Sequence, residues 1–224
     1  METNDNNNTT NFKSPKGNLG GLFYRIISLV IQPLLIPTYG MMLLMRVDVY
    51  SVQSSVWKLV AVIGTLVFTG ILPAIPIFLL MRKGEVTDMF ISKKEERTMP
   101  YLFSFMAYIF WALFMWRTLK FEQINSMFIV AMGIASAASI FIVVIINLKW
   151  KISAHMTGIG GLTGAVFGVC YRTAINPVWF FALILGVSAL VAISRIELKA
   201  HTPGQTLAGY VLGFLLVFTP CFFF

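Results

Sequence analysis

Charged residues are scarce in this chain of 224 residues, and their scarcity excludes an ordinary soluble protein. Lys, Arg, Asp and Glu make up 12% of the residues, whereas hydrophobic residues make up 58%. Soluble domains carry about 25% charged residues. Together with a mean hydropathy of +0.81, this composition predicts an integral membrane protein. In such a protein, we expect the net charge of +8 to set the topology and to contact anionic lipid headgroups, and not to bind nucleic acid.

Cysteine and histidine are also rare, which limits the chemistry to be expected. Cys170 and Cys221 both lie inside apolar stretches, without the spacing of metal ligands. The two histidines are His155 and His201. Because no cluster of Asp, His and Cys has convincing metal spacing, we expect a chemistry that uses neither metal nor cofactor.

Apolar stretches account for most of the chain. Crossing a bilayer takes about 20 residues. Seven stretches approach that length: 21–44, 56–81, 100–116, 124–147, 155–171, 177–193 and 205–224. We therefore expect an all-α, polytopic membrane helix bundle with about six or seven transmembrane helices. We expect residues 1–20 to be a disordered tail. We expect residues 21–224 to form a single membrane-embedded domain.

Prolines in the first two stretches predict irregular helices. Pro33 and Pro37 fall in the first stretch, and Pro73 and Pro76 in the second. Membrane helices tolerate proline where neighbouring groups satisfy the freed carbonyls. We expect kinks at both places.

Three polar islands interrupt the apolar pattern. The first, residues 82–100, is the most charged part of the chain; the second, 149–155, contains one histidine, and the third, 194–205, contains the other. Two predicted spans separate the first island from the second, and two more separate the second from the third. An even number of crossings places all three at one membrane face, where they can share a site.

Glycines at four-residue intervals predict which helices pack closely at that face. Gly160, Gly164 and Gly168 share one side of the fifth stretch, and Gly209 and Gly213 repeat the spacing in the last. Small residues let the backbones of two membrane helices approach each other. Close packing of these two helices would bring together their N-terminal ends, each of which carries a histidine.

Residues near both histidines are typical of helix starts. Thr202, Pro203 and Gln205 fit the N-cap, N1 and N3 positions of a capping box. Ser153 is placed to cap the fifth helix in the same way. Helix N-termini offer unpaired N–H groups and a partial positive charge, and both favour phosphate.

The islands contain the residue types that phosphate transfer without a metal requires. Arg195, Arg97 and a lysine of the first island can surround phosphoryl oxygens. Because imidazole titrates near neutral pH, one histidine can attack in its neutral form while the other donates a proton.

In their order, the islands resemble the three signatures of the type 2 phosphatidic acid phosphatase superfamily, which comprises lipid phosphatases and vanadium haloperoxidase-like proteins. Residues 194–205 read Ser-Arg, five residues, His, three residues and Gln, which is similar to Ser-Arg-x5-His-x3-Asp. Residues 153–155, Ser-Ala-His, look like Pro-Ser-Gly-His. Residues 93–100 look like a degenerate Lys-x6-Arg-Pro. The resemblance covers roughly residues 60–220.

The resemblance implies a divergent, bacterial-type enzyme of the inner (cytoplasmic) membrane that hydrolyses a lipid phosphate or diphosphate through a phosphohistidine. By analogy, His201 is the nucleophile, His155 the acid for the leaving group, and Gln205 the residue that orients His201. The expected phosphate ligands are Arg195, Arg97, Lys94 and Ser153. The expected partners are the bilayer and a substrate of the phosphatidate, phosphatidylglycerophosphate or polyprenyl diphosphate type.

Departures from the family pattern leave a second function open. Gln205 replaces an aspartate, so it can accept a hydrogen bond from the histidine but supplies no charge, and it serves equally well as a helix cap. Phe90 occupies the position of the family lysine, so Lys93 or Lys94 must substitute, and we favour Lys94. The alternative is a non-catalytic protein that binds or moves a phosphorylated lipid.

The membrane side of the site also stays open at this stage. Basic residues concentrate on the face of the islands, and the positive-inside rule makes that face cytoplasmic. Bacterial relatives that recycle lipid carriers act on the outer face instead. A small-molecule transporter is a distant third function, because no charged residue lies in the middle of a predicted span.

Overall fold

The computed structural model describes residues 19–47, 50, 52–88, 91, 93–124 and 127–223, and every regular element in these ranges is helical. Most of the predicted tail, residues 1–18, lies outside them. In chain order the elements are α1 (Leu19–Val30), α2 (Ile36–Leu44), α4 (Ser55–Thr65), the π-helical segment η1 (Leu66–Ile71), α5 (Leu72–Arg82), the 3-10 turn η2 (Glu95–Arg97), α6 (Thr98–Phe121), α7 (Met127–Lys149), α8 (Ala154–Thr173), α9 (Val178–Glu197), α10 (Pro203–Phe218) and α11 (Pro220–Phe223).

Four spans within the described residues are long and apolar enough to cross a membrane: Ser55–Arg82, Glu95–Phe121, Met127–Lys149 and Val178–Glu197. Large apolar side chains point outward from them, for example Leu113, Ile145 and Leu183, the last of which is 60% exposed. The all-α class and the apolar helices expected of a membrane protein are thus confirmed. The count of six or seven spans stays a prediction, because α1 and α10 are shorter.

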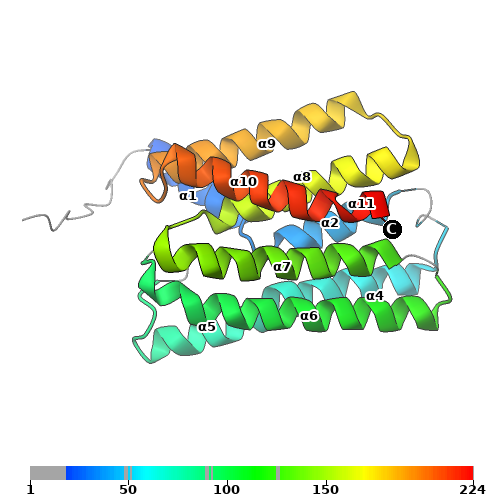
Figure 1. The fold of residues 1–224 in the computed structure, drawn as a ribbon, viewed down its shortest axis with the longest axis horizontal. Coiled ribbons are helices and arrows are strands. Elements are labelled where there is room, and N and C mark those ends of the chain that lie inside the picture. Colours follow the sequence, from blue (N-terminus) through cyan, green and yellow to red (C-terminus); the bar gives the residue numbers. More distant parts are fainter. Residues whose placement is uncertain are drawn as a thin grey trace, which may run out of the picture.

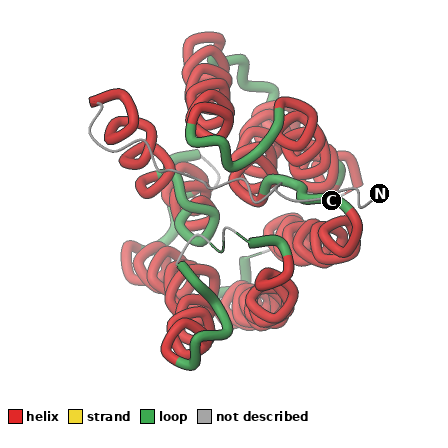
Figure 2. Tube along the Cα trace, turned by 90° about the vertical axis from the view of Figure 1, so that its left-hand side faces the viewer, coloured by secondary structure: helices red, strands yellow, loops and turns green. Residues whose placement is uncertain are grey.

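The helices form two groups that meet at α2 (Figure 1). An apolar cluster joins α2, α4, α6 and α7, with Trp57 and Met115 among its fully buried members. A second cluster joins α2, α8 and α9 through Ile159 and Val191. Figure 2 looks at the bundle from the end where α6, α8 and α10 begin, and shows the helices nearly end-on. The C-terminal helix α11 lies at the opposite end (Figure 1).

The first predicted span, residues 21–44, is two helices, so the expectation of one helix is wrong. α1 ends at Val30 and α2 begins at Ile36. Pro33 lies in the irregular segment between them, and Pro37 stands in the first turn of α2, where its missing N–H costs no helical hydrogen bond. After the break the two helices pack on different neighbours, α1 on α9 and α2 on α4 and α8.

The second predicted span is continuous from Ser55 to Arg82 but irregular. The π-helical segment η1 ends directly before α5, which has Pro73 in its first turn and Pro76 inside it. Proline lacks the N–H that would bond the carbonyl of the preceding turn, and a wider turn accommodates the mismatch. The predicted irregularity at these prolines therefore takes the form of a π-helical segment.

The close pairing of α8 with α10 confirms the interpretation of the glycine spacing. The two helices run parallel, since Gly209 lies against the backbone of Ser153 and Gly213 against that of Thr157. A Cβ atom at Gly209 would come within 2.6 Å of the Ser153 carbonyl oxygen. Gly160 and Gly164 of α8 approach the backbone of α10 just as closely, at Tyr210 and Phe214. The two N-terminal ends are therefore adjacent.

Candidate functional site

The three polar islands contribute to one cavity of about 480 Å³, which α2, α6, α7 and α8 enclose. The polar lining at its island end includes Arg97, Tyr101, His155, Arg195 and His201. The remaining wall is predominantly apolar. The structure thus brings together both histidines and both arginines that the sequence singled out.

Arg97 and Arg195 are buried, with 3% and 6% of their surfaces exposed. Neither forms an ion pair with a carboxylate of the described residues. Arg97 donates from Nε to the carbonyl of Ile91 (2.8 Å) and from Nη1 to that of Ile152 (3.3 Å). The Nε of Arg195 is buried and has no acceptor among the described residues. Buried guanidinium groups without a counter-charge are costly, so the cavity favours an anion.

Gln205 holds His201 and caps α10 with the same oxygen. Its Oε1 lies 3.2 Å from Nδ1 of His201 and accepts from the backbone N–H of Thr202, also at 3.2 Å. The Thr202 hydroxyl accepts from the Gln205 N–H, which completes the predicted capping box. With Nδ1–H donating to Gln205, the lone pair of His201 is on Nε2. The two roles considered for Gln205 therefore coexist.

His201 is neutral at ordinary pH in this environment. Burial is the main cause that lowers its pKa to about 3, and the positive charges of Arg97, Arg195 and Lys151 lower it further. The hydrogen bond to Gln205 acts in the opposite direction. A neutral imidazole with a free Nε2 lone pair has the protonation state of a nucleophile.

His155 begins α8 and points its Nε2 at the first helix. Nε2 donates to the backbone carbonyl of Ser28 at 3.2 Å. The hydroxyl of Ser153 caps α8 as predicted, by accepting from the N–H of Met156 (3.4 Å). Ser153 is fully buried and is not part of the cavity wall. Its hydroxyl is thus engaged with the helix backbone, and the structure does not bring it to the arginines as a phosphate ligand.

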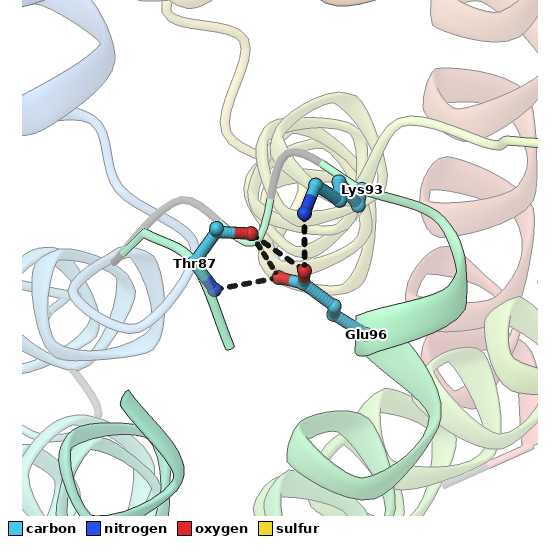
Figure 3. Close-up of polar contacts among 3 residues, drawn as sticks. All are labelled: Thr87, Lys93 and Glu96. Atoms are coloured by element: carbon cyan, nitrogen blue, oxygen red, sulfur yellow. Dashed lines mark hydrogen bonds and ion pairs between the residues drawn. The ribbon is translucent and has the colours of Figure 1, made fainter. Parts of the chain in front are cut away.

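Neither lysine proposed for phosphate binding lines the cavity. Lys94 donates to the carbonyl of Leu148 at 3.2 Å, and Lys93 pairs with Glu96 at 3.1 Å. Figure 3 shows that the Glu96 carboxylate also receives the N–H and hydroxyl of Thr87. Phe90, which occupies the position of the family lysine, lies outside the described residues.

Lys151 is the lysine coupled to the charged end of the cavity. It is half-buried, and burial lowers its pKa, followed by the charges of Arg97 and Arg195. Its charge in turn lowers the pKa of His201. The sequence pointed to the second island for His155 and Ser153, and nothing in the motif spacing distinguished this lysine.

Ser28 of α1 is the other residue that sequence reasoning missed. Its hydroxyl accepts from Nη1 of Arg195 (3.1 Å) and pairs with the hydroxyl of Ser194 (2.8 Å), while its carbonyl accepts from His155. It is 1% exposed. A single serine in an apolar stretch gives no motif, and only the packing of α1 against α9 places it here.

The charged lining does not suit a cation. No group of three His, Cys, Asp or Glu side chains within the described ranges is placed to hold a metal ion. The residues that meet at the cavity are cationic or neutral donors, which suit an anion such as phosphate.

Comparisons with protein-family models, with curated proteins and with solved structures give no match. What the site does must therefore be inferred from its own residues.

Proposed function

We propose that this chain is a membrane-embedded, metal-independent phosphatase of the type 2 phosphatidic acid phosphatase kind, which hydrolyses a lipid phosphate or diphosphate. The observation that carries the proposal is the pair of buried arginines, Arg97 and Arg195, which have no carboxylate partner among the described residues and line the polar end of an otherwise apolar cavity. A phosphate group supplies the missing charge and acceptors, and a lipid chain suits the apolar wall.

The proposed reaction has two steps. In the first, Nε2 of His201 attacks phosphorus, the N–P bond forms, and the P–O bond to the lipid breaks. Burial and the charge of Arg195 lower the pKa of His155 in the unliganded protein, so the negative charge of the bound phosphate must favour the protonated form, which gives its proton to the departing oxygen. In the second, water attacks the phosphorus of the phosphohistidine and the N–P bond breaks. Neutral His155 takes a proton from the attacking water. The products are the lipid without that phosphate, inorganic phosphate and the original His201.

The arginines would act mainly by electrostatic stabilisation. The guanidinium groups are already fixed by hydrogen bonds, Arg97 to two carbonyls and Arg195 to Ser28. Donors fixed before the reaction need little reorganisation as charge moves among the phosphoryl oxygens. Removing one such donor from an enzyme typically costs about 100-fold or more in rate.

Phosphate release by the purified protein in lipid nanodiscs tests the proposal. Phosphatidate, phosphatidylglycerophosphate and a polyprenyl diphosphate are offered separately. We expect release from at least one, and its loss in His201→Ala and Arg195→Gln. Lys93→Ala is the matched control, because Lys93 pairs with Glu96 outside the cavity. No release from any of the three, or full release by His201→Ala, would sink the proposal.

A non-catalytic lipid-binding function is the second candidate. It is favoured by the uncharged Gln205 beside His201 and by the absence of Lys93 and Lys94 from the cavity wall. Saturable binding of the same lipids, with no turnover even in Gln205→Asp, would support this function instead. For both candidate functions, we propose that the protein lies in a bacterial inner membrane.

A further inference from the structure

The cavity that contains the proposed phosphate site continues along α8 to the opposite end of the bundle. Its wall includes His155 at the start of this helix and Thr173 at its end. At 1.5 Å per residue, that distance is about 27 Å. Arg46, two residues after the end of α2, is exposed and also lines the cavity. The hydrocarbon core of a bilayer is about 30 Å thick, so the cavity is nearly as long as the core.

The wall between the two ends suits hydrocarbon. It is formed mainly by aliphatic side chains, of which α7 supplies Ile129 and Val143 and α8 supplies Leu162 and Val166. Three serines also face it, but each donates its hydroxyl to a carbonyl of its own helix: Ser104, Ser136 and Ser139. Wall hydroxyls that are already bonded contribute little specificity for a polar ligand.

We infer that this cavity holds the hydrocarbon chain of the phosphorylated lipid inside the helix bundle, with the head group at Arg97 and Arg195 and the chain running toward Thr173. The inference rests on the proposed function for its phosphate end. An acyl chain of a bilayer lipid extends through one leaflet, or about half of the 30 Å core. A cavity of about 27 Å therefore selects a longer chain, of the kind found in polyprenyl phosphates and diphosphates.

The position of the chain is a better readout than the affinity of the lipid. A chain in the bilayer is already out of water, so its transfer into an apolar cavity gains little hydrophobic free energy. Affinity comes instead from the phosphate end, where Nε of Arg195 is buried without an acceptor among the described residues. A test should therefore locate the far end of the chain.

Photo-crosslinking locates it directly. The probe is eicosyl phosphonate with a diazirine at the end of its chain, added to the full-length protein in nanodiscs; its C–P bond is not a phosphatase substrate. We expect label on residues that line the far part of the cavity, such as Val169, Thr173 and Phe180. Label mainly on outward-facing residues such as Leu183 and Ile145 would place the chain in the bilayer and overturn the inference.

Three variants sharpen the result. Ala165→Trp fills the middle of the cavity wall, and we expect far-end label to fall about tenfold. Ala182→Trp adds the same side chain on the exposed surface of α9 and should leave the label unchanged. Arg195→Gln removes a charge-assisted hydrogen bond to the phosphonate, which also predicts a loss of about tenfold. Far-end label that survives Arg195→Gln or Ala165→Trp would contradict the inference.

These outcomes separate the inference from the proposed function. Far-end label in a protein that releases no phosphate would support the inference and count against catalysis. Phosphate release with label confined to outward-facing residues would support catalysis and overturn the inference.

Discussion

The hydroxyl of Ser28 accepts a hydrogen bond from Nη1 of Arg195 at 3.1 Å, across 167 residues of sequence. The same residue accepts from Nε2 of His155 through its carbonyl. One residue of α1 thereby fixes the orientation of a guanidinium and an imidazole that line the cavity. In the proposed reaction, these two groups bind phosphate and protonate the leaving oxygen.

Ser28→Ala is expected to weaken phosphate binding without unfolding the protein. The substitution removes the acceptor of Arg195 and keeps the carbonyl that holds His155. Loss of a hydrogen bond to a charged group costs about 1.5–3 kcal/mol, so we expect KM, and the Kd for orthovanadate, to rise by about tenfold or more. Ser28→Thr, which keeps the hydroxyl, should restore much of the binding.

The matched control for this prediction is Ser136→Ala. Ser136 also lines the cavity, but its hydroxyl donates to the carbonyl of Met132 in its own helix. Equal effects of the two alanine variants on orthovanadate binding would show that Ser28 has no particular role in positioning Arg195.

Much of the site could be predicted from sequence because its parts depend on local rules. The capping box at Thr202 and Gln205 follows from hydrogen bonds within one turn, and the pairing of α8 with α10 follows from glycine spacing. The even number of predicted spans between the two histidines placed them at the same membrane face, and this prediction needed no knowledge of packing.

The remaining features depend on tertiary packing, which leaves no local signal. The break between Val30 and Ile36 turns one predicted span into two helices, and this lets α1 carry Ser28 to Arg195. Prolines marked the irregularity but did not say whether it would be a kink or a complete break. Lys151 was missed for a similar reason, since its coupling to the arginines depends on how the islands fold together.

Gln205→Asp is expected to raise activity. Phosphorylation of His201 places positive charge on its ring, and glutamine offers Nδ1 a hydrogen-bond acceptor without a counter-charge. A carboxylate there would form a charge-assisted bond, roughly twice as strong as a neutral one, so we expect kcat to increase about tenfold. Steady-state phosphate release measures it. Gln205→Glu, which keeps the side-chain length of glutamine and so places a carboxylate oxygen where Oε1 now lies, is the control for charge alone, and an unchanged or lower kcat in Gln205→Asp would contradict the assigned role.

The protonation of His201 should follow its lowered pKa. A pKa of about 3 in the folded protein means that the ring stays neutral from neutral pH down to about pH 4, whereas the same ring in an unfolded chain titrates near 6.5. Nitrogen-15 NMR of the two histidines, assigned with His155→Asn, measures this. Bound orthovanadate should raise the midpoint, because its negative charge offsets that of the arginines. A midpoint near 6.5 in the unliganded protein would refute the prediction.

The same shift makes a prediction about stability. Because the folded-state pKa of His201 lies below the unfolded one, the unfolded chain takes up the proton first as the pH falls from about 6.5 toward 3. The contribution of His201 to stability is therefore fully present above about pH 6.5 and is lost progressively below it. Thermal unfolding in detergent at several pH values should show a smaller acid-side loss in His201→Asn than in the parent protein.

Lys151, and not Lys94, is expected to affect the electrostatics of the cavity. Removing its charge in Lys151→Met should raise the pKa of His201, since the lysine is one of the charges that lower it. It should also weaken orthovanadate binding. Lys94→Met removes an equal charge from a lysine that donates to the carbonyl of Leu148 outside the cavity, and should change neither. A larger effect of Lys94→Met on the pKa of His201 and on orthovanadate binding would favour Lys94 as the phosphate ligand, as the sequence predicted.

Gly213→Ala should disrupt the site through the helix pair that carries both histidines. Its Cβ would collide with the backbone of Thr157 and lie 2.8 Å from the N atom of Gly161, and backbone atoms yield less than side chains do. Overpacking of this kind costs about 1–3 kcal/mol, and separating α8 from α10 would move His155 away from His201. We expect a lower thermal midpoint together with a loss of phosphate release.

Gly186→Ala on α9 is the matched control. No atom lies within 4 Å of the added Cβ, so this variant should leave activity intact and raise stability slightly, because alanine favours the helix. If both variants behaved alike, the close approach of α8 and α10 would not be what holds the two histidines together.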